Sequence, residues 1–183
     1  MSRRKVNLVI ICEDVQQSSF ARRYLIKRGF HNRKIRIIKC PAGAMSGEQF
    51  VRRQLISEVK LYRKKSSYGQ GGIALVALID ADTKSVQERL EQINSALEQE
   101  GVESIKQNER IAIFIPKRNI ETWIRFAKNR NNTDENTVYS KLKKPRSCRD
   151  EVDLYVNTIC KDGIPSDALP SLVHACNELV KIL

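Results

Sequence analysis

The chain has 183 residues and a formal net charge of +12 at pH 7, because 33 Lys and Arg stand against 21 Asp and Glu. This length suits one domain with a proper core, and 41% hydrophobic with 30% charged residues excludes a disordered chain. No apolar run approaches the roughly 20 residues that span a membrane, so we expect a cytoplasmic protein without a membrane partner. The positive charge favours a polyanionic partner, of which nucleic acid is the commonest.

The first part of the chain alternates strand patterns with helix patterns. Residues 5–12 are a continuous β-branched run, which predicts a strand buried on both faces. Residues 18–30 carry apolar side chains at helical spacing, and residues 34–40 predict a second strand. Residues 47–65 then predict a basic amphipathic helix.

The same alternation continues through the middle of the chain. Residues 73–80 predict a third strand, and residues 84–101 predict a helix with one apolar face. Residues 110–116 predict a fourth strand, and residues 119–128 predict the helix that follows it. We therefore predict an α/β fold: a mostly parallel sheet of about four strands with helices on both faces.

The C-terminal part of the chain has a different character. Residues 129–150 are polar and predict a surface loop, while residues 152–160 and 171–183 predict two helices. We therefore expect an α/β core over residues 1–128. Over residues 129–183 we expect a polar loop and a short helical appendage that packs on that core.

The five cysteines are scattered along the chain, and none forms a Cys-x-x-Cys pair. With only two histidines in addition, the spacing typical of a zinc site is absent. We expect most of these cysteines to be buried thiols, which is typical of a reducing compartment.

Acidic residues follow three of the four predicted strands. Glu13 and Asp14 come directly after the first strand. Asp80 and Asp82 come after the third strand, and Glu121 falls in the first turn of the helix after the fourth. Because parallel strands end at one edge of a sheet, we expect these acids to converge. Such carboxylates raise each other's pKa values, and a hard divalent cation removes that cost.

At these residues the sequence resembles the Toprim family, the metal-binding domain of topoisomerases, primases and related nucleases. That family carries a glutamate after its first strand and Asp-x-Asp after a later one, which match Glu13 in VIICED and Asp80 and Asp82 in ALIDAD. The segment IPKRNIETWI resembles a segment of Toprim domains of the overcoming-lysogenisation-defect type and of small relatives linked to phage defence; it would carry the role of a further metal-site acid to Glu121. The resemblance covers residues 5–127.

The resemblance implies a Toprim-like nuclease that uses Mg²⁺ or Mn²⁺ to cut the phosphodiester bonds of DNA or RNA. The implied catalytic and metal-binding residues are Glu13, Asp80, Asp82 and Glu121. Glu13 would be a general base or a metal ligand. By analogy the protein would be an effector of phage defence, and since the sequence has no P-loop, its partner ATPase would be a separate protein.

Several basic residues are candidates for contacts with phosphate. The resemblance implies this role for Lys117 and Arg118, which precede Glu121. The basic runs at residues 63–65 and 141–146 could contact phosphates or form solvated faces.

Three alternatives remain open. A Toprim-like module without catalysis would bind nucleic acid or a partner protein. The motif LIDADT also resembles the first motif of haloacid-dehalogenase phosphatases, with Asp80 as nucleophile and Asp82 as general acid. The sequence also resembles a receiver domain, through the acid pair after the first strand together with Asp80 and Lys117. In such a domain Asp80 would accept a phosphoryl group.

Overall fold

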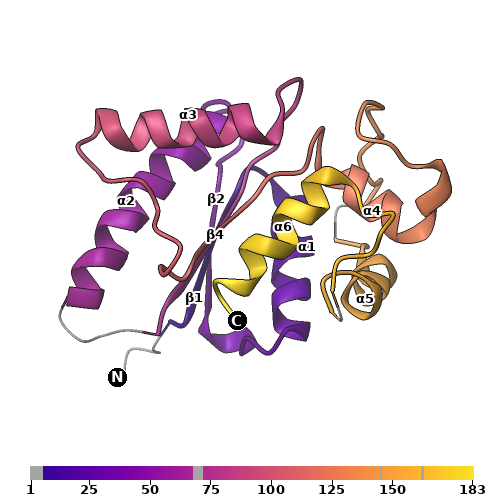
Figure 1. Ribbon diagram of the computed structural model, residues 1–183, viewed down its shortest axis with the longest axis horizontal. Helices are drawn as coiled ribbons and strands as arrows, with labels where there is room; N and C mark the ends of the chain where they lie inside the picture. Colours follow the sequence, from indigo (N-terminus) through magenta and orange to yellow (C-terminus); the bar gives the residue numbers. More distant parts are fainter. Residues whose placement is uncertain (1–5, 68–71, 145, 162) are drawn as a thin grey trace.

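A computed structural model describes residues 6–67, 72–144, 146–161 and 163–183 of the chain. Its centre is a four-stranded sheet in the order β2-β1-β3-β4, and every neighbouring pair is parallel (Figure 1). The strands are β1 (Leu8–Cys12), β2 (Ile35–Lys39), β3 (Ala74–Leu78) and β4 (Ile111–Phe114). This arrangement confirms the predicted fold class. Lys5, the predicted start of the first strand, lies outside the described residues.

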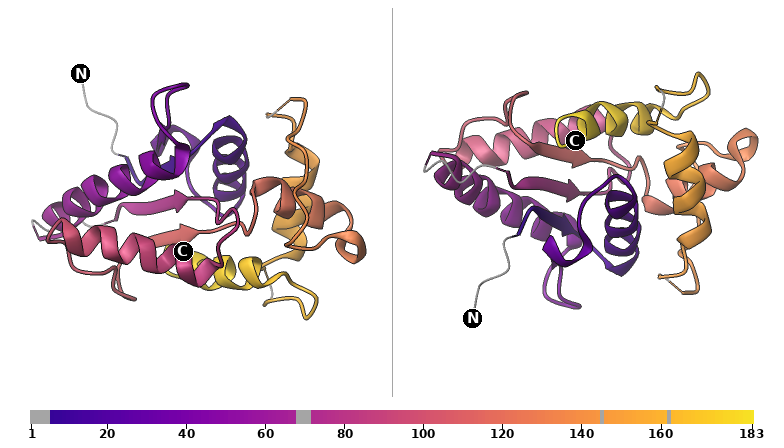
Figure 2. Two further views of the ribbon diagram at one scale, coloured as in Figure 1. Left: turned by 90° about the horizontal axis from the view of Figure 1, so that it is seen from above. Right: turned by 90° about the horizontal axis from the view of Figure 1, so that it is seen from below.

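Helices cover both faces of the sheet. They are α1 (Val15–Lys27), α2 (Gly47–Ser67), α3 (Val86–Gln99), α4 (Ile120–Lys128), α5 (Arg149–Thr158) and α6 (Pro170–Val180), with short 3₁₀ turns η1 (Asn32–Lys34) and η2 (Arg130–Asn132). Figure 1 shows α2 and α3 on one side of the sheet and α1 and α6 on the other. Figure 2 shows α4 and α5 together at the end of the molecule toward which the strand arrowheads point.

The strands are apolar throughout because each one packs against helices on both faces. Successive side chains of a strand point to opposite sides of the sheet. In β1, Leu8 and Ile10 join a core with Phe20 of α1, which also takes in α4, α5 and α6. Val9 and Ile11 join a second core with α2 and α3. This explains why a continuous apolar run, rather than an alternating one, marked the strand.

Helix α6 covers the outer edge of β4. The backbone N–H of Ile113 donates to Glu178 Oε2 at 2.9 Å, and the carbonyl of Ile113 lies 2.9 Å from His174 Nε2. Two side chains thus pair the backbone groups that an edge strand would otherwise offer to another chain. Among the described residues, no helix is both long enough and apolar enough to cross a membrane.

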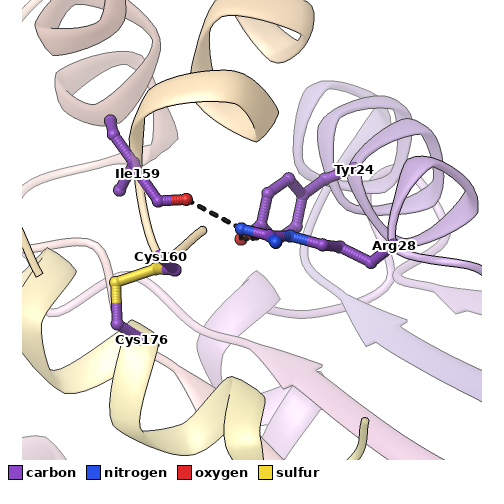
Figure 3. Close-up of a disulfide and its surroundings, with 5 residues drawn as sticks. All are labelled: Tyr24, Arg28, Ile159, Cys160 and Cys176. Carbon is purple, nitrogen blue, oxygen red and sulfur yellow. Dashed lines mark hydrogen bonds between the residues drawn. A yellow bond between two sulfur atoms is a disulfide. The ribbon is translucent and has the colours of Figure 1, made fainter. Parts of the chain in front are cut away.

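A disulfide joins the end of the α5 segment to α6. Cys160 and Cys176 are bonded, with their Cα atoms 5.2 Å apart (Figure 3). Beside it, Arg28 of α1 donates a hydrogen bond of 2.8 Å to the carbonyl of Ile159. The expectation of buried thiols is therefore wrong for this pair, because chain folding brings two residues 16 positions apart into contact. It holds for the free, buried Cys12, Cys40 and Cys148.

Candidate functional site

The carboxyl ends of β1 and β3 are joined through an acid. Glu13 follows β1 directly, and its Oε1 accepts a hydrogen bond of 2.7 Å from the backbone N–H of Asp80, in the loop after β3. The next residue, Asp14, caps α1 by accepting a 2.8 Å hydrogen bond from the N–H of Gln17. Two of the predicted site residues, 67 positions apart, are therefore in contact at the predicted edge of the sheet.

Gln17 forms hydrogen bonds with both Glu13 and Asp80. Its Oε1 accepts a hydrogen bond of 2.8 Å from the N–H of Glu13, and its Nε2 donates one of 2.9 Å to Asp80 Oδ1. The residue is completely buried. Sequence reasoning missed it, although a glutamine three residues before Phe20 on the apolar face of α1 was an available signal.

The pKa of Asp80 is raised by its surroundings. Burial raises it well above its usual range, and the negative charges of Glu13, Asp14, Asp82 and Glu121 raise it further, in that order of size. The pKa of Glu13 is raised to about 7, again first by burial, while the hydrogen bond from the Asp80 N–H opposes the rise. The other three predicted acids, Glu13, Asp82 and Glu121, therefore all act electrostatically on Asp80.

Glu121 lies in the first turn of α4, as predicted, and is 3% exposed. Neither of its carboxylate oxygens makes a hydrogen bond of standard geometry with a described residue. Burial raises its pKa, and the charge of Asp14 adds to the rise, while Lys141 and the side chain of Gln16 oppose it. A buried carboxylate with so little compensation is a costly group to keep for stability alone.

Asp82 has a different setting from the other acids. Its backbone is left-handed, with φ of 55°, and its side chain is 65% exposed. Aspartate adopts this conformation more readily than most residues, and such backbone often marks functional loops. Its nearest cation is Arg89 of α3, whose Nη2 lies 3.4 Å from Asp82 Oδ2.

Arg89 is a second residue that sequence reasoning missed. It is 2% exposed, and it ties the loop after β3 to α2 by donating to the carbonyl of Ala81 at 3.3 Å and to Glu48 Oε1 at 2.7 Å. The available signal was its position, four residues before Ile93 on the apolar face of the helix. A buried arginine in that stripe needs acceptors from neighbouring elements.

Gly47 sets how closely α2 approaches the site. A Cβ at this position would lie 2.7 Å from both Cβ and Oε2 of Glu13, well inside van der Waals contact. Only glycine lets the first residue of α2 pack against the Glu13 side chain, so a larger residue would displace the carboxylate.

The predicted phosphate contacts, Lys117 and Arg118, form no ion pair with the acids among the described residues. Lys117 Nζ donates to the backbone carbonyl of Lys84, and Arg118 Nε donates to the carbonyl of Asn136 at 3.1 Å. From the basic run at residues 141–146, Lys141 reaches the site instead, with its Nζ 3.0 Å from Asp14 Oδ2.

The basic run at residues 63–65 contributes to structure. Arg63 pairs with Glu109 through two bonds, of 2.7 and 2.9 Å, away from the acids.

The acids at this edge carry carboxylate oxygens, the kind of ligand that hard divalent cations prefer. Across the ranges that the structure describes, no three side chains of Asp, Glu, His or Cys stand close enough together to hold one ion. However, Mg²⁺ commonly takes only one or two carboxylates and completes its shell with water and phosphate oxygens. Asp80 with its raised pKa and Glu121 with its unpaired oxygens are both groups that a cation would stabilise.

Comparison of this chain with family models, curated proteins and solved structures gives no match.

Proposed function

We propose that this chain is a divalent-metal-dependent nuclease that cuts phosphodiester bonds of nucleic acid. The observation that carries the proposal is the convergence of acids at the carboxyl edge: Glu13 Oε1 accepts a 2.7 Å hydrogen bond from the Asp80 N–H, and burial with four neighbouring carboxylates raises the pKa of Asp80. Perturbed groups of this kind cluster at functional sites. The net charge of +12 supports a polyanionic substrate, and the resemblance to the Toprim family supports the reaction.

In this proposal Mg²⁺ or Mn²⁺ is held by the acids at the carboxyl edge of the sheet: Glu13, Asp80, Asp82 and Glu121. A bound ion would polarise a phosphoryl oxygen and offset the repulsion among the carboxylates. Asp80 is positioned for this task by the Gln17 amide, and the Asp82 loop is held by Arg89.

The side chain of Glu13 supplies the proton chemistry. A pKa of about 7 lets its carboxylate accept a proton from an attacking water at neutral pH. Its Oε1 accepts a hydrogen bond from the Asp80 N–H, and in this proposal Oε2 would accept the proton. Lys117 and Arg118 would stabilise charge on the phosphoryl oxygens. By the Toprim resemblance alone, the proposal extends to an effector of phage defence working with a partner ATPase.

The test is incubation of the purified protein with DNA and with RNA, in Mg²⁺, Mn²⁺ or EDTA. We expect metal-dependent cutting that falls at least about 100-fold in Asp80→Asn, a loss typical of removing a group that acts in the transition state. Glu98→Gln, on the exposed side of α3, is the matched control and should cut normally. Absence of cutting with either metal, both for the chain alone and with any ATPase whose gene adjoins its own, would overturn the proposal.

A second candidate is a Toprim-like module that binds nucleic acid or a partner protein without cutting. It is favoured by the hydrogen bond that already engages Glu13 and by the absence, in the described ranges, of three acids close enough for one ion. Binding that is unchanged in Asp80→Asn, with no cutting by the natural chain, identifies the module. Labelling of Asp80 by acetyl phosphate would instead favour a phosphoacceptor.

A further inference from the structure

A basic groove runs along the outer face of α1. Its volume is about 770 Å³, and it is bounded by α1, by β2 with the η1 turn, and by the chain that leads into α5. Its cations come from all three segments: Arg22, Arg23, Lys27, Lys39, Arg146 and Arg149. The opposite face of α1, with Phe20 and Tyr24, is buried in the core, so the groove occupies the solvent side of this helix.

The charge of the groove is almost uncompensated. Asp153 is the one acid in its lining, and it already pairs with Lys27, with Nζ 3.2 Å from Oδ1. The other five cations have no acid partner within salt-bridge distance among the described residues. Five unpaired like charges in one concavity repel one another, and an anion with several charges would relieve that repulsion.

Part of the groove is fixed in advance of any ligand. Arg22 donates from Nε and Nη2 to Asn32 Oδ1, at 3.1 and 2.8 Å, which holds its guanidinium in one orientation. Apolar side chains of Val15, Ile26 and Ile37 lie among the cations. A surface that alternates fixed positive charge with apolar patches suits a chain of phosphates joined by sugars better than a small free anion.

One end of the groove is formed by residues that adjoin the acids in the chain or in strand register. Val15, which lines the groove, follows Asp14, and Lys39 is the last residue of β2, paired in register with Cys12 just before Glu13. The other end of the groove is at Lys27, the last residue of α1. The 13 residues of this helix span about 20 Å, which equals the axial length of about six base pairs of a duplex at a rise of roughly 3.4 Å.

We propose that this groove binds the phosphate backbone of a nucleic acid and leads it to the acids at the carboxyl edge of the sheet. As a route to a cutting site, the inference rests on the proposed function. As a binding surface, it is tested independently of cutting.

The experiment measures binding of a fluorescent 20-nucleotide single strand, as DNA and as RNA, by anisotropy in EDTA. The groove variant is the triple change Lys39→Gln, Arg146→Gln and Arg149→Gln, which removes three exposed charges without breaking an ion pair between described residues. The control variant removes three exposed charges from α2, on the other side of the sheet: Arg53→Gln, Lys64→Gln and Lys65→Gln. Thermal melts check that both variants fold.

We expect the groove variant to bind at least about 10-fold more weakly, and the slope of log affinity against log salt to fall by about 2. The control variant should lose less than about 3-fold. An equal loss in both variants would show diffuse attraction to a basic protein, and an unchanged groove variant would show that the nucleic acid lies elsewhere; either result overturns the inference. Binding of polyglutamate but not of the oligonucleotide would also overturn it, in favour of an acidic protein partner.

The two proposals fail in different ways. If Asp80→Asn and the natural chain bind the oligonucleotide equally in EDTA and neither cuts with metal, the groove proposal survives and the nuclease proposal is wrong. If the natural chain cuts, and the groove variant binds the oligonucleotide as tightly as the natural chain, the nuclease proposal is supported and the groove proposal is wrong. If both are right, the groove variant should cut with a raised KM and a nearly unchanged kcat.

Discussion

Partly buried acids have opposite surroundings at the two edges of the sheet. At the amino edge, Glu109 precedes β4 and receives two hydrogen bonds from Arg63, at 2.7 and 2.9 Å. Burial acts to raise its pKa, but the bonds from Arg63 and from the Lys106 N–H leave it lowered. At the carboxyl edge, Asp80 is surrounded by carboxylates and an amide, and its pKa is raised.

This difference separates acids that stabilise the fold from acids that cost the fold stability. A carboxylate that meets a guanidinium through both oxygens is stabilised in its charged form and stabilises the chain. Carboxylates gathered without a cation cost stability and are retained where they serve a function. The following predictions test this contrast, beginning with the largest expected effect.

Of the two edges of the sheet, only the carboxyl edge should matter for cutting. We expect Glu13→Gln to lower metal-dependent cutting at least about 100-fold, because it removes the proposed proton acceptor. Glu109→Gln should cut within about 2-fold of the natural chain. Initial rates on one labelled substrate, at equal concentrations of folded protein, provide the comparison; similar losses in both variants would contradict it.

Stability should respond in the opposite sense at the two edges. Asp80→Asn should raise the free energy of unfolding at pH 8 by about 1–3 kcal/mol, because it removes a buried charge that other carboxylates repel. Glu109→Gln should lower it by about 1–2 kcal/mol, because it weakens the pairing with Arg63. Urea unfolding in EDTA measures both, with Glu98→Gln as the neutral control. A destabilised Asp80→Asn would show that this edge is structural.

The raised pKa of Glu13 predicts a pH dependence. Between the usual 4.5 and about 7, the folded chain holds a proton on Glu13 that the unfolded chain has lost, so stability should fall as pH rises through this range. We expect a loss of about 1–3 kcal/mol that is absent in Glu13→Gln. Mg²⁺ at pH 8 should restore part of it in the natural chain and none in Asp80→Asn. Parallel pH profiles for the natural chain and Glu13→Gln would refute this assignment.

A smaller effect of opposite sign should come from His174. Burial lowers its pKa, while Glu178 opposes the shift. The unfolded chain therefore binds the extra proton first, and stability should fall as pH drops below about 6.5. Replacing His174 with Gln, which can still donate to the Ile113 carbonyl, should reduce this acid loss by about 0.5–1 kcal/mol. Denaturant midpoints at pH 5 and pH 7.5 are measured for the natural chain and for His174→Gln. The same difference between the two pH values in both proteins would contradict this role of His174.

The site was only partly predictable from the sequence. Asp80 and Glu13 could be placed at one edge because each follows an apolar strand, and parallel strands end together. Gln17 and Arg89 could be noticed as polar residues on the apolar faces of helices, but their partners could not be predicted, because these depend on which groups of other elements face them. The sequence predicts Gly47 only as the first residue of a helix, and the approach of α2 to Glu13 shows why no side chain fits there.

The sequence by itself determined the parallel α/β fold and the edge where the acids lie, since short-range periodicity and the order of strands and helices decide both. Only the tertiary structure decided the 2.7 Å contact between Glu13 and the Asp80 N–H, the Cys160–Cys176 bond, and the joining of α1, β2 and the start of α5 into one basic groove. These features join residues far apart in the chain, and their distances depend on packing, which local sequence pattern does not encode.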